Sequence, residues 1–129
     1  MITELVAPSM PKAKFKYSPF VQAGPYIQSA GLVGLDPSTG QLVVGGPGAE
    51  TRQILSNLAA ALKELDLKVD DLVIARIFTT SMARFSEINM EWDAFFENRS
   101  ILPARTAVGV SALPISASVE IEFQFYKEK

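Results

Sequence analysis

The spacing of apolar residues predicts two amphipathic helices with a buried strand between them. In residues 49–65, apolar side chains recur three and four positions apart along one helix face: Ile54, Leu55, Leu58, Ala61, Leu62 and Leu65. The same period returns in residues 82–98, where the stripe is aromatic: Phe85, Ile88, Trp92, Phe95 and Phe96. We expect both stripes to pack in a core. Residues 72–80 are rich in β-branched side chains and lack proline and glycine, which predicts a central strand.

Shorter apolar segments predict strands in the N-terminal half. Residues 20–23 and 26–33 flank a Gly-Pro turn and predict a hairpin. A second turn at residues 36–40 leads into residues 41–44, which predict a short strand or an extended segment. Residues 1–16 show no clear period, so we expect an irregular N-terminal arm.

The C-terminal half predicts two further strands, at residues 104–110 and 119–126. We expect them to pair as an antiparallel hairpin about residue 115. The predicted order of strands and helices is typical of an α+β fold, in which both helices cover one face of a mixed sheet. A chain of 129 residues has the length of one domain, so we expect residues 1–129 to fold as a single unit.

The composition of the chain excludes several kinds of catalytic and metal-binding site. The chain has no cysteine and no histidine, which excludes thiolate catalysis, serine-histidine-aspartate triads and histidine zinc sites. A net charge of -2 gives no support to nucleic-acid binding. No apolar run reaches the roughly 18 residues that span a bilayer. We therefore expect a soluble, cytoplasmic protein that uses no metal or organic cofactor.

Two charges near the C-terminus are the best candidates for function. On a pleated strand, Arg105 shares its face with Ala107 and Gly109, whose small side chains leave room for a ligand. A guanidinium matches the planar geometry of a carboxylate. Glu120 lies within an apolar strand. Two ordinary explanations stay open: the arginine pairs with a nearby acid or extends to water, and Glu120, like Glu122, belongs to the solvated strand face.

The predicted topology determines whether Arg105 and Glu120 can lie close together within one chain. We expect the sheet face without helices to carry Arg105, Ala107, Gly109 and Glu120, and to contact solvent or another subunit. If the last two strands form a hairpin, Arg105 and Glu120 lie ~15 Å apart along the sheet. They would then meet only across a symmetric interface between two copies of the chain.

The sequence resembles the RidA family of enamine/imine deaminases, also described as endoribonuclease L-PSP or translation inhibitor. The resemblance covers most of the chain from Phe20 onward, and these segments carry it: residues 29–31, 36–40, Asn89 with residues 92–96, 103–105 and 119–122. It implies a chorismate-mutase-like α+β fold, a homotrimer, and active sites in clefts between subunits. It also implies that Arg105 holds the substrate carboxylate, that Gly31 and Ala107 add contacts, and that Glu120 orients water.

The sequence departs from the family pattern at three places, one of which is Thr106 and Ala107 in place of a frequent Ser-Cys pair. The aromatic residue of the first strand, often tyrosine in active members, is matched to Phe20, whose missing hydroxyl would have to come from Tyr17 or Tyr26. A position that commonly carries a hydroxyl is Ala30. The expected substrate-binding set is thus Arg105, Gly31, Ala107, Phe20 and Ala30, with Arg105 and Glu120 as catalytic residues.

The expected activity is hydrolysis of reactive 2-enamine or 2-imine acids to 2-keto acids and ammonia, of the 2-iminobutanoate/2-iminopropanoate deaminase type. The imine carbon is already electrophilic, so orientation and one positioned water suffice. Two alternatives stay open: a deaminase of another carboxylated enamine, such as an aminomuconate-type compound, and a non-catalytic sensor of small carboxylates. Ribonuclease activity has the least support, because there is no histidine for acid-base chemistry and no basic groove.

Overall fold

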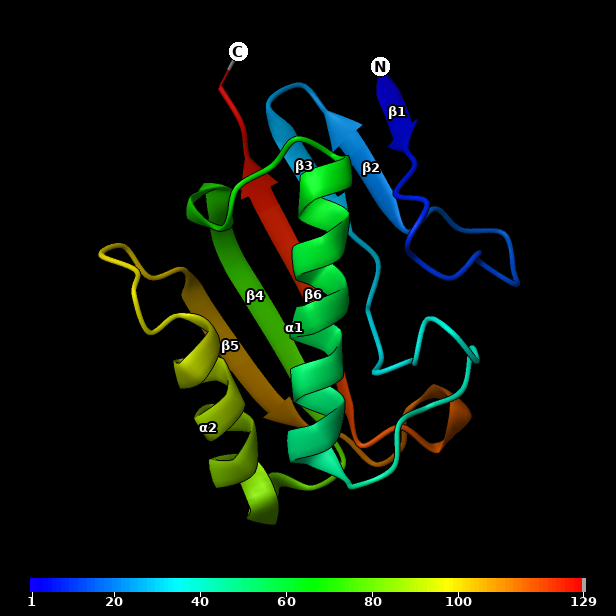
Figure 1. Ribbon diagram of the computed structural model, residues 1–129, viewed down its shortest axis with the longest axis vertical. Coiled ribbons are helices and arrows are strands. Elements are labelled where there is room, and N and C mark those ends of the chain that lie inside the picture. Colours follow the sequence, from blue (N-terminus) through cyan, green and yellow to red (C-terminus); the bar gives the residue numbers. More distant parts are fainter. Residues whose placement is uncertain (129) are drawn as a thin grey trace.

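A six-stranded mixed sheet, with both long helices on one of its faces, forms the molecule (Figure 1). The computed structural model describes residues 1–128. The strands are β1 (Ile2–Leu5), β2 (Phe20–Ala23), β3 (Tyr26–Ser29), β4 (Leu72–Thr79), β5 (Ala104–Gly109) and β6 (Val119–Tyr126), and the helices are α1 (Pro47–Glu64) and α2 (Phe85–Phe95). Their order in the sheet is β1-β2-β3-β6-β4-β5. The expected α+β architecture is confirmed.

Both helices form where the apolar period predicts them. A proline in the first turn begins α1, where its missing N–H is not needed. Helix α2 starts at Phe85, three residues later than predicted, because Met82–Arg84 forms a short 3₁₀ turn, η2. Two further 3₁₀ turns are η1 (Val69–Asp71) and η3 (Pro114–Ser116).

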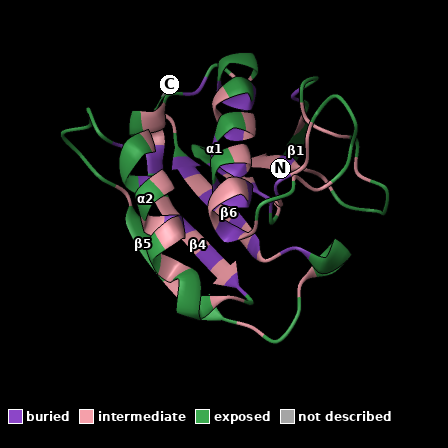
Figure 2. Ribbon diagram, turned by 60° about the horizontal axis from the view of Figure 1, so that its bottom comes forward, coloured by how far each residue is buried: buried purple, intermediate pink, exposed green. Residues whose placement is uncertain are grey.

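The core lies between the helices and the sheet (Figure 2). Alternate residues of β6 are fully buried there: Val119, Ile121, Phe123 and Phe125. They meet the buried stripe of α1, which includes Ile54, Leu58 and Ala61. The residues between them on β6, among them Glu120 and Glu122, point to the face of the sheet that has no helices.

The predicted pairing of the last two strands is wrong. β4 lies between β5 and β6, pairing parallel with β5 and antiparallel with β6. The reason is the connection through α2, because a strand that follows a crossover helix returns parallel to the strand before it. β5 therefore forms an edge of the sheet, and residues 110–118 carry the chain past β4 to β6.

The N-terminal arm is more ordered than its sequence predicts. Ile2–Leu5 forms β1, which pairs antiparallel with β2 at the other edge of the sheet. Residues 41–44 form no strand and make only one bridge, between Leu35 and Leu42. Within residues 1–128, no helix combines the length and apolarity that crossing a membrane requires.

Candidate functional site

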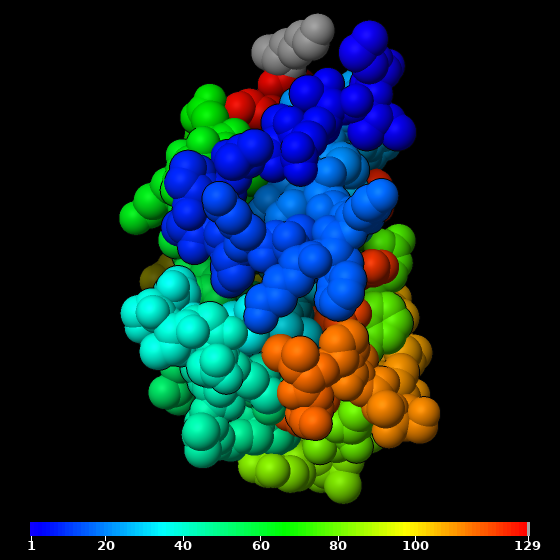
Figure 3. All heavy atoms as spheres, turned by 90° about the vertical axis from the view of Figure 1, so that its right-hand side faces the viewer, coloured from blue at the N-terminus to red at the C-terminus, as the bar shows by residue number. Residues whose placement is uncertain are grey.

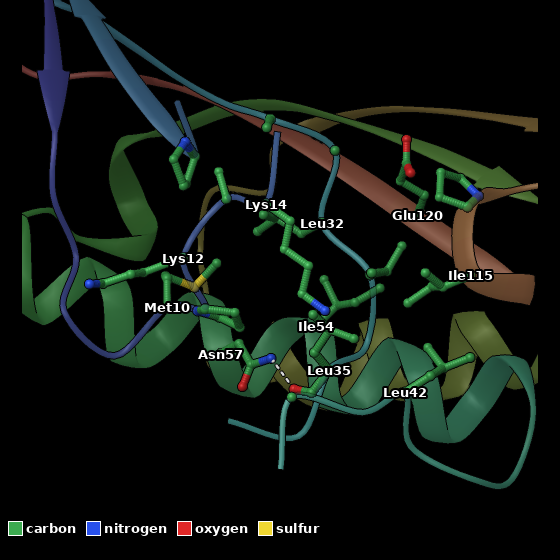
Figure 4. Close-up of a pocket in the computed structure, with 18 of the residues that line it drawn as sticks. Met10, Lys12, Lys14, Leu32, Leu35, Leu42, Ile54, Asn57, Ile115 and Glu120 are labelled. Atoms are coloured by element: carbon green, nitrogen blue, oxygen red, sulfur yellow. Dashed lines mark hydrogen bonds between the residues drawn. The ribbon is translucent and has the colours of Figure 1, made fainter. Parts of the chain in front are cut away.

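A cavity of about 950 Å³ opens on one side of the sheet, where three distant segments converge. Figure 3 shows this face: the N-terminal arm, the loop after β3 and the turn before β6 lie next to one another. The residues that line the cavity include Tyr17, Ala30, Gly31, Ile115 and Glu120 (Figure 4). The sequence indicated candidate residues in the loop after β3 and near the turn before β6. It did not predict that the N-terminal arm contacts these two segments.

A break in strand pairing shapes the cavity beside Glu120. β3 pairs with β6 only as far as Gln28. At the next residue the Ser29 hydroxyl accepts a hydrogen bond from the Phe123 N–H at 2.8 Å, in place of a backbone carbonyl. The chain returns to β6 at Leu32, whose N–H donates to the Ile121 carbonyl at 2.8 Å. Residues 30 and 31 thus pass beside β6 without pairing.

Glycine at position 31 lets the Glu120 carboxylate lie directly against the backbone. A β-carbon on Gly31 would lie 2.7 Å from the Glu120 carboxyl carbon, a distance that real side chains do not reach. The Glu120 carboxylate therefore occupies the space that a side chain at position 31 would fill. This contact supports the expected pairing of Gly31 and Glu120 in one site.

The pKa of the Glu120 carboxyl is raised in the folded protein. Burial raises its pKa above the ordinary value, and the negative charge of Glu122 raises it further. No hydrogen-bond donor among residues 1–128 contacts its oxygens. Such a carboxylate can accept a hydrogen bond from a bound water or take a proton from it.

Arg105 lies on a different face from the one predicted. In the parallel ladder it is in register with Ala75, and Ala107 is in register with Ile77. Ala75 and Ile77 are fully buried under the helices, so Arg105 and Ala107 also point to the helix side. Ala107 packs against the core, and Arg105 is exposed at the edge of the sheet.

The Arg105 guanidinium has no acidic partner among the described residues. The other four arginines each pair with a carboxylate: Arg52, Arg76, Arg84 and Arg99. Arg105 lies instead over the rings of Phe85 and Trp92, 5.3 Å from each centroid. These contacts hold the planar group in place and leave its N–H donors free. The alternative of a local ion pair is therefore wrong for this arginine.

Arg105 and Glu120 do not meet within one chain. β4 separates their strands, and the two side chains point to opposite faces of the sheet. The expected hairpin and shared face are both wrong, and the two residues are kept apart by the opposite faces of the sheet instead. A site that uses both residues must take them from two copies of the chain.

The aromatic residues that line the cavity are Phe15 and Tyr17, and Phe20 is not among them. Phe20 is fully buried in the core, so it cannot contact a ligand in the cavity. Tyr17 lines the cavity and is 55% exposed, which supplies the hydroxyl that Phe20 lacks. Ala30 lines the cavity as expected, whereas Ala107 does not. The described residues hold no cluster of acidic side chains that would bind a metal ion.

Comparison with known families matches the sequence model of endoribonuclease L-PSP to residues 7–125. The chain belongs to this family, which is also called RidA. The RidA-family fold is equally clear in solved structures. The YjgF gene product of E. coli superposes with a TM-score of 0.90 at 30% identity, covering 98% of this chain and 99% of that one.

Relatives of this RidA-family chain carry two kinds of name. A RutC family protein of Aquifex aeolicus is 36% identical over 119 residues, covering 92% of this chain and 94% of the relative. A 2-iminobutanoate/2-iminopropanoate deaminase of Mus musculus is 40% identical over 112 residues, covering 87% and 82%. A protein of the same name from Salmonella typhimurium is 32% identical over 123 residues, covering 95% of each chain.

Proposed function

We propose that the protein hydrolyses 2-imino acids, and the 2-enamines from which they form, to 2-keto acids and ammonia. The observation that carries this proposal is the free guanidinium of Arg105, which two aromatic rings hold with its donors available. A fixed, unpaired guanidinium is suited to bind a carboxylate through two hydrogen bonds. The relatives named 2-iminobutanoate/2-iminopropanoate deaminase support the choice of an imine.

In this mechanism Arg105 binds and orients the substrate carboxylate. Glu120 accepts a hydrogen bond from a water and takes its proton as the oxygen adds to the imine carbon. Glu120 returns this proton to the nitrogen, which gives an intermediate with a hydroxyl and an amino group on one carbon. Glu120 then takes the hydroxyl proton and passes it to the nitrogen, so that the carbon-nitrogen bond breaks, the C=O bond of the ketone forms and ammonia leaves with both water protons. The raised pKa of Glu120 makes its carboxylate a stronger base for taking the proton from water. No step needs a metal or an organic cofactor.

We place each active site between two subunits of a homotrimer. The two charges cannot meet in one chain, because they occupy opposite sheet faces. The face without helices is the natural contact surface, since it carries the Tyr26 and Tyr126 rings, 5.3 Å apart and partly exposed. Arg105, at the edge of the sheet, would then enter the Glu120 cavity of a neighbour.

The direct test is Arg105→Ala in a coupled assay, where an amino-acid oxidase generates the imine. We expect deamination to fall to the spontaneous rate, because the carboxylate loses its anchor. Arg99→Ala is the matched control, since Arg99 contacts only Asp70 at the surface, and it should keep full activity. Undiminished turnover by Arg105→Ala would refute the mechanism. Binding of a keto acid without turnover by the wild type would indicate a sensor.

Mixing two inactive variants tests the shared site. Arg105→Ala and Glu120→Gln chains are unfolded together and refolded at equal concentration. If each site takes one residue from each neighbour, about one quarter of the interfaces are intact and activity recovers to about that fraction. A site within one chain would stay inactive in every mixture.

A further inference from the structure

We propose that Lys14 makes the cavity selective for imines that carry a second anionic group. The inference rests on the proposed function, because it names the class of substrate that this site takes. Arg105 of a neighbouring copy would bind the carboxylate beside the imine, and Lys14 would bind an anion at the far end of the substrate. Three features of the N-terminal arm and the cavity lead to this assignment.

First, the arm is fixed to the body of the protein just before Lys14. β1 pairs with β2, and Ala7 is buried in the core. The Ser9 N–H donates to both carboxylate oxygens of Glu64 on α1, at 3.1 and 3.0 Å. The Met10 N–H closes a turn on the Ala7 carbonyl at 2.9 Å. The segment that follows therefore lies across the cavity and lines it.

Second, the Lys14 side chain points into the cavity without an acidic partner. Figure 4 shows its ammonium between Leu32, Leu35 and Ile54, whereas Lys12 points away from Glu120. Within residues 1–128, no carboxylate lies in ion-pair distance of Lys14. Lys14 is exposed, so its ammonium is accessible from solvent. An unpaired ammonium at the wall of a cavity can bind an entering anion through charge-assisted hydrogen bonds.

Third, the cavity of one chain has room for a substrate longer than a four-carbon imino acid in addition to the Arg105 side chain of a neighbour. Its volume of about 950 Å³ lies at the upper end of sites for drug-sized ligands, roughly 300 to 1,000 Å³. Glu120 and Lys14 line the same cavity from different segments, β6 and the arm. A substrate with its imine at Glu120 can therefore extend an apolar chain toward Lys14. The class is 2-iminodicarboxylates, which oxidation of acidic amino acids supplies.

The test compares two imines of equal carbon number, 2-iminoadipate and 2-iminohexanoate, which an amino-acid oxidase generates from 2-aminoadipate and norleucine. We expect the wild type to favour 2-iminoadipate in kcat/KM. Lys14→Met keeps the length and apolar stem but removes the charge, so it should lower that preference about tenfold, the typical worth of one charge-assisted contact. Activity on 2-iminohexanoate should stay within about twofold of the wild type.

Lys16→Met is the matched control, because Lys16 lies on the same arm but does not line this cavity. It should leave both activities unchanged. The inference is overturned if Lys14→Met keeps the wild-type ratio, or if Lys16→Met lowers it equally, which would indicate only a long-range effect of charge.

A binding measurement separates this inference from the proposed function. The products, 2-oxoadipate and 2-oxohexanoate, are titrated calorimetrically into wild type and Lys14→Met. If no imine is hydrolysed but 2-oxoadipate still binds more tightly in a Lys14-dependent way, only the deaminase proposal fails. If imines are hydrolysed but both products bind equally in both proteins, only the role of Lys14 fails.

Discussion

At the scale of the residue, Gly31 and Glu120 define the site together, because one occupies the space that the other leaves empty. Gly31→Ala would push the Glu120 carboxylate out of its position, since the added methyl group collides with it. The displaced atoms belong to the end of a flexible side chain, so the free energy of unfolding should change by less than about 1 kcal/mol. Deamination should fall at least about tenfold, because water is misplaced.

Two measurements check this prediction: the coupled assay and a denaturant unfolding curve. Gly24→Ala serves as a control, because nothing lies within 4 Å of a β-carbon there, although its positive φ of 60° adds strain. The control should lose stability and keep its turnover. If Gly31→Ala retained full activity, the carboxylate position would not matter for the reaction.

The pKa of Glu120 also predicts how stability depends on pH. In the folded protein burial raises this pKa above its ordinary 4.5, whereas the unfolded chain keeps the ordinary value. Above pH 4.5 the folded state therefore holds more protons than the unfolded state, and stability falls as the pH rises through the folded pKa. Glu120→Gln removes this loss. The free energy of unfolding of this variant should exceed that of the wild type at about pH 7, and the difference should vanish at about pH 4.

Urea unfolding at both pH values measures this difference. The matched control is Glu122→Gln, on the same strand face but in an ion pair with Arg76 at 3.4 Å. It should not show the advantage of Glu120→Gln at about pH 7, because it loses a favourable partner. An equal gain for Glu120→Gln at both pH values would show that its charge is irrelevant to stability.

At the scale of the element, Glu50 joins α1 to the start of β6. Glu50 is 4% exposed, and its carboxylate accepts hydrogen bonds from the Ser118 N–H at 2.8 Å, the Ser118 hydroxyl at 2.6 Å and the Val119 N–H at 3.3 Å. Glu50→Ala removes the acceptor from the half-buried Ser118 donors and from the buried Val119 N–H. We expect the free energy of unfolding to fall by about 2–4 kcal/mol.

Thermal and denaturant unfolding measure this loss. Glu91→Ala is the control on the other helix, because its partner Arg52 is 73% exposed and such surface pairs contribute little. The proposed role of Glu50 fails if both substitutions have the same small effect.

The elements also show what a sequence can predict. The period of α1 and α2 is strong enough to locate both helices, and alternation locates β4, β5 and β6 within a residue or two. The pairing of the strands is harder to predict, because no local sequence pattern indicates that β4 lies between β5 and β6. The face of Arg105 was also predicted wrongly, because the register that sets it, with Ala75 beside it in β4, joins strands far apart in the chain.

The cavity was harder to predict for a related reason. Tyr17 and Lys14 lie in a segment without periodic signal, and their positions depend on β1 and on the Ser9 contact with Glu64. Such contacts join residues far apart in the chain, so a local pattern does not reveal them. Phe20 was matched to the site because it is aromatic, yet its neighbours in the fold make it core.

At the scale of the whole molecule, the proposal requires the sheet face without helices to be the contact surface between subunits. Val108 lies on this face at the edge strand, in register with Phe78, and is 41% exposed. Val108→Glu places a charge where the proposal requires contact between subunits, and a desolvated, unpaired charge opposes association. We expect the wild type to have about three times the chain mass of 14.0 kDa, and the variant to have that mass once.

Sedimentation measures the mass, circular dichroism the fold, and the coupled assay the activity. Val44→Glu is a matched control, because Val44 is 96% exposed in a loop outside the sheet and should keep both the trimer and the turnover. If the Val108 variant becomes a folded monomer and also loses activity, assembly and catalysis depend on the same surface, as a site shared between copies demands. A folded, active monomer would contradict the shared site, because Arg105 would then have no Glu120 within reach.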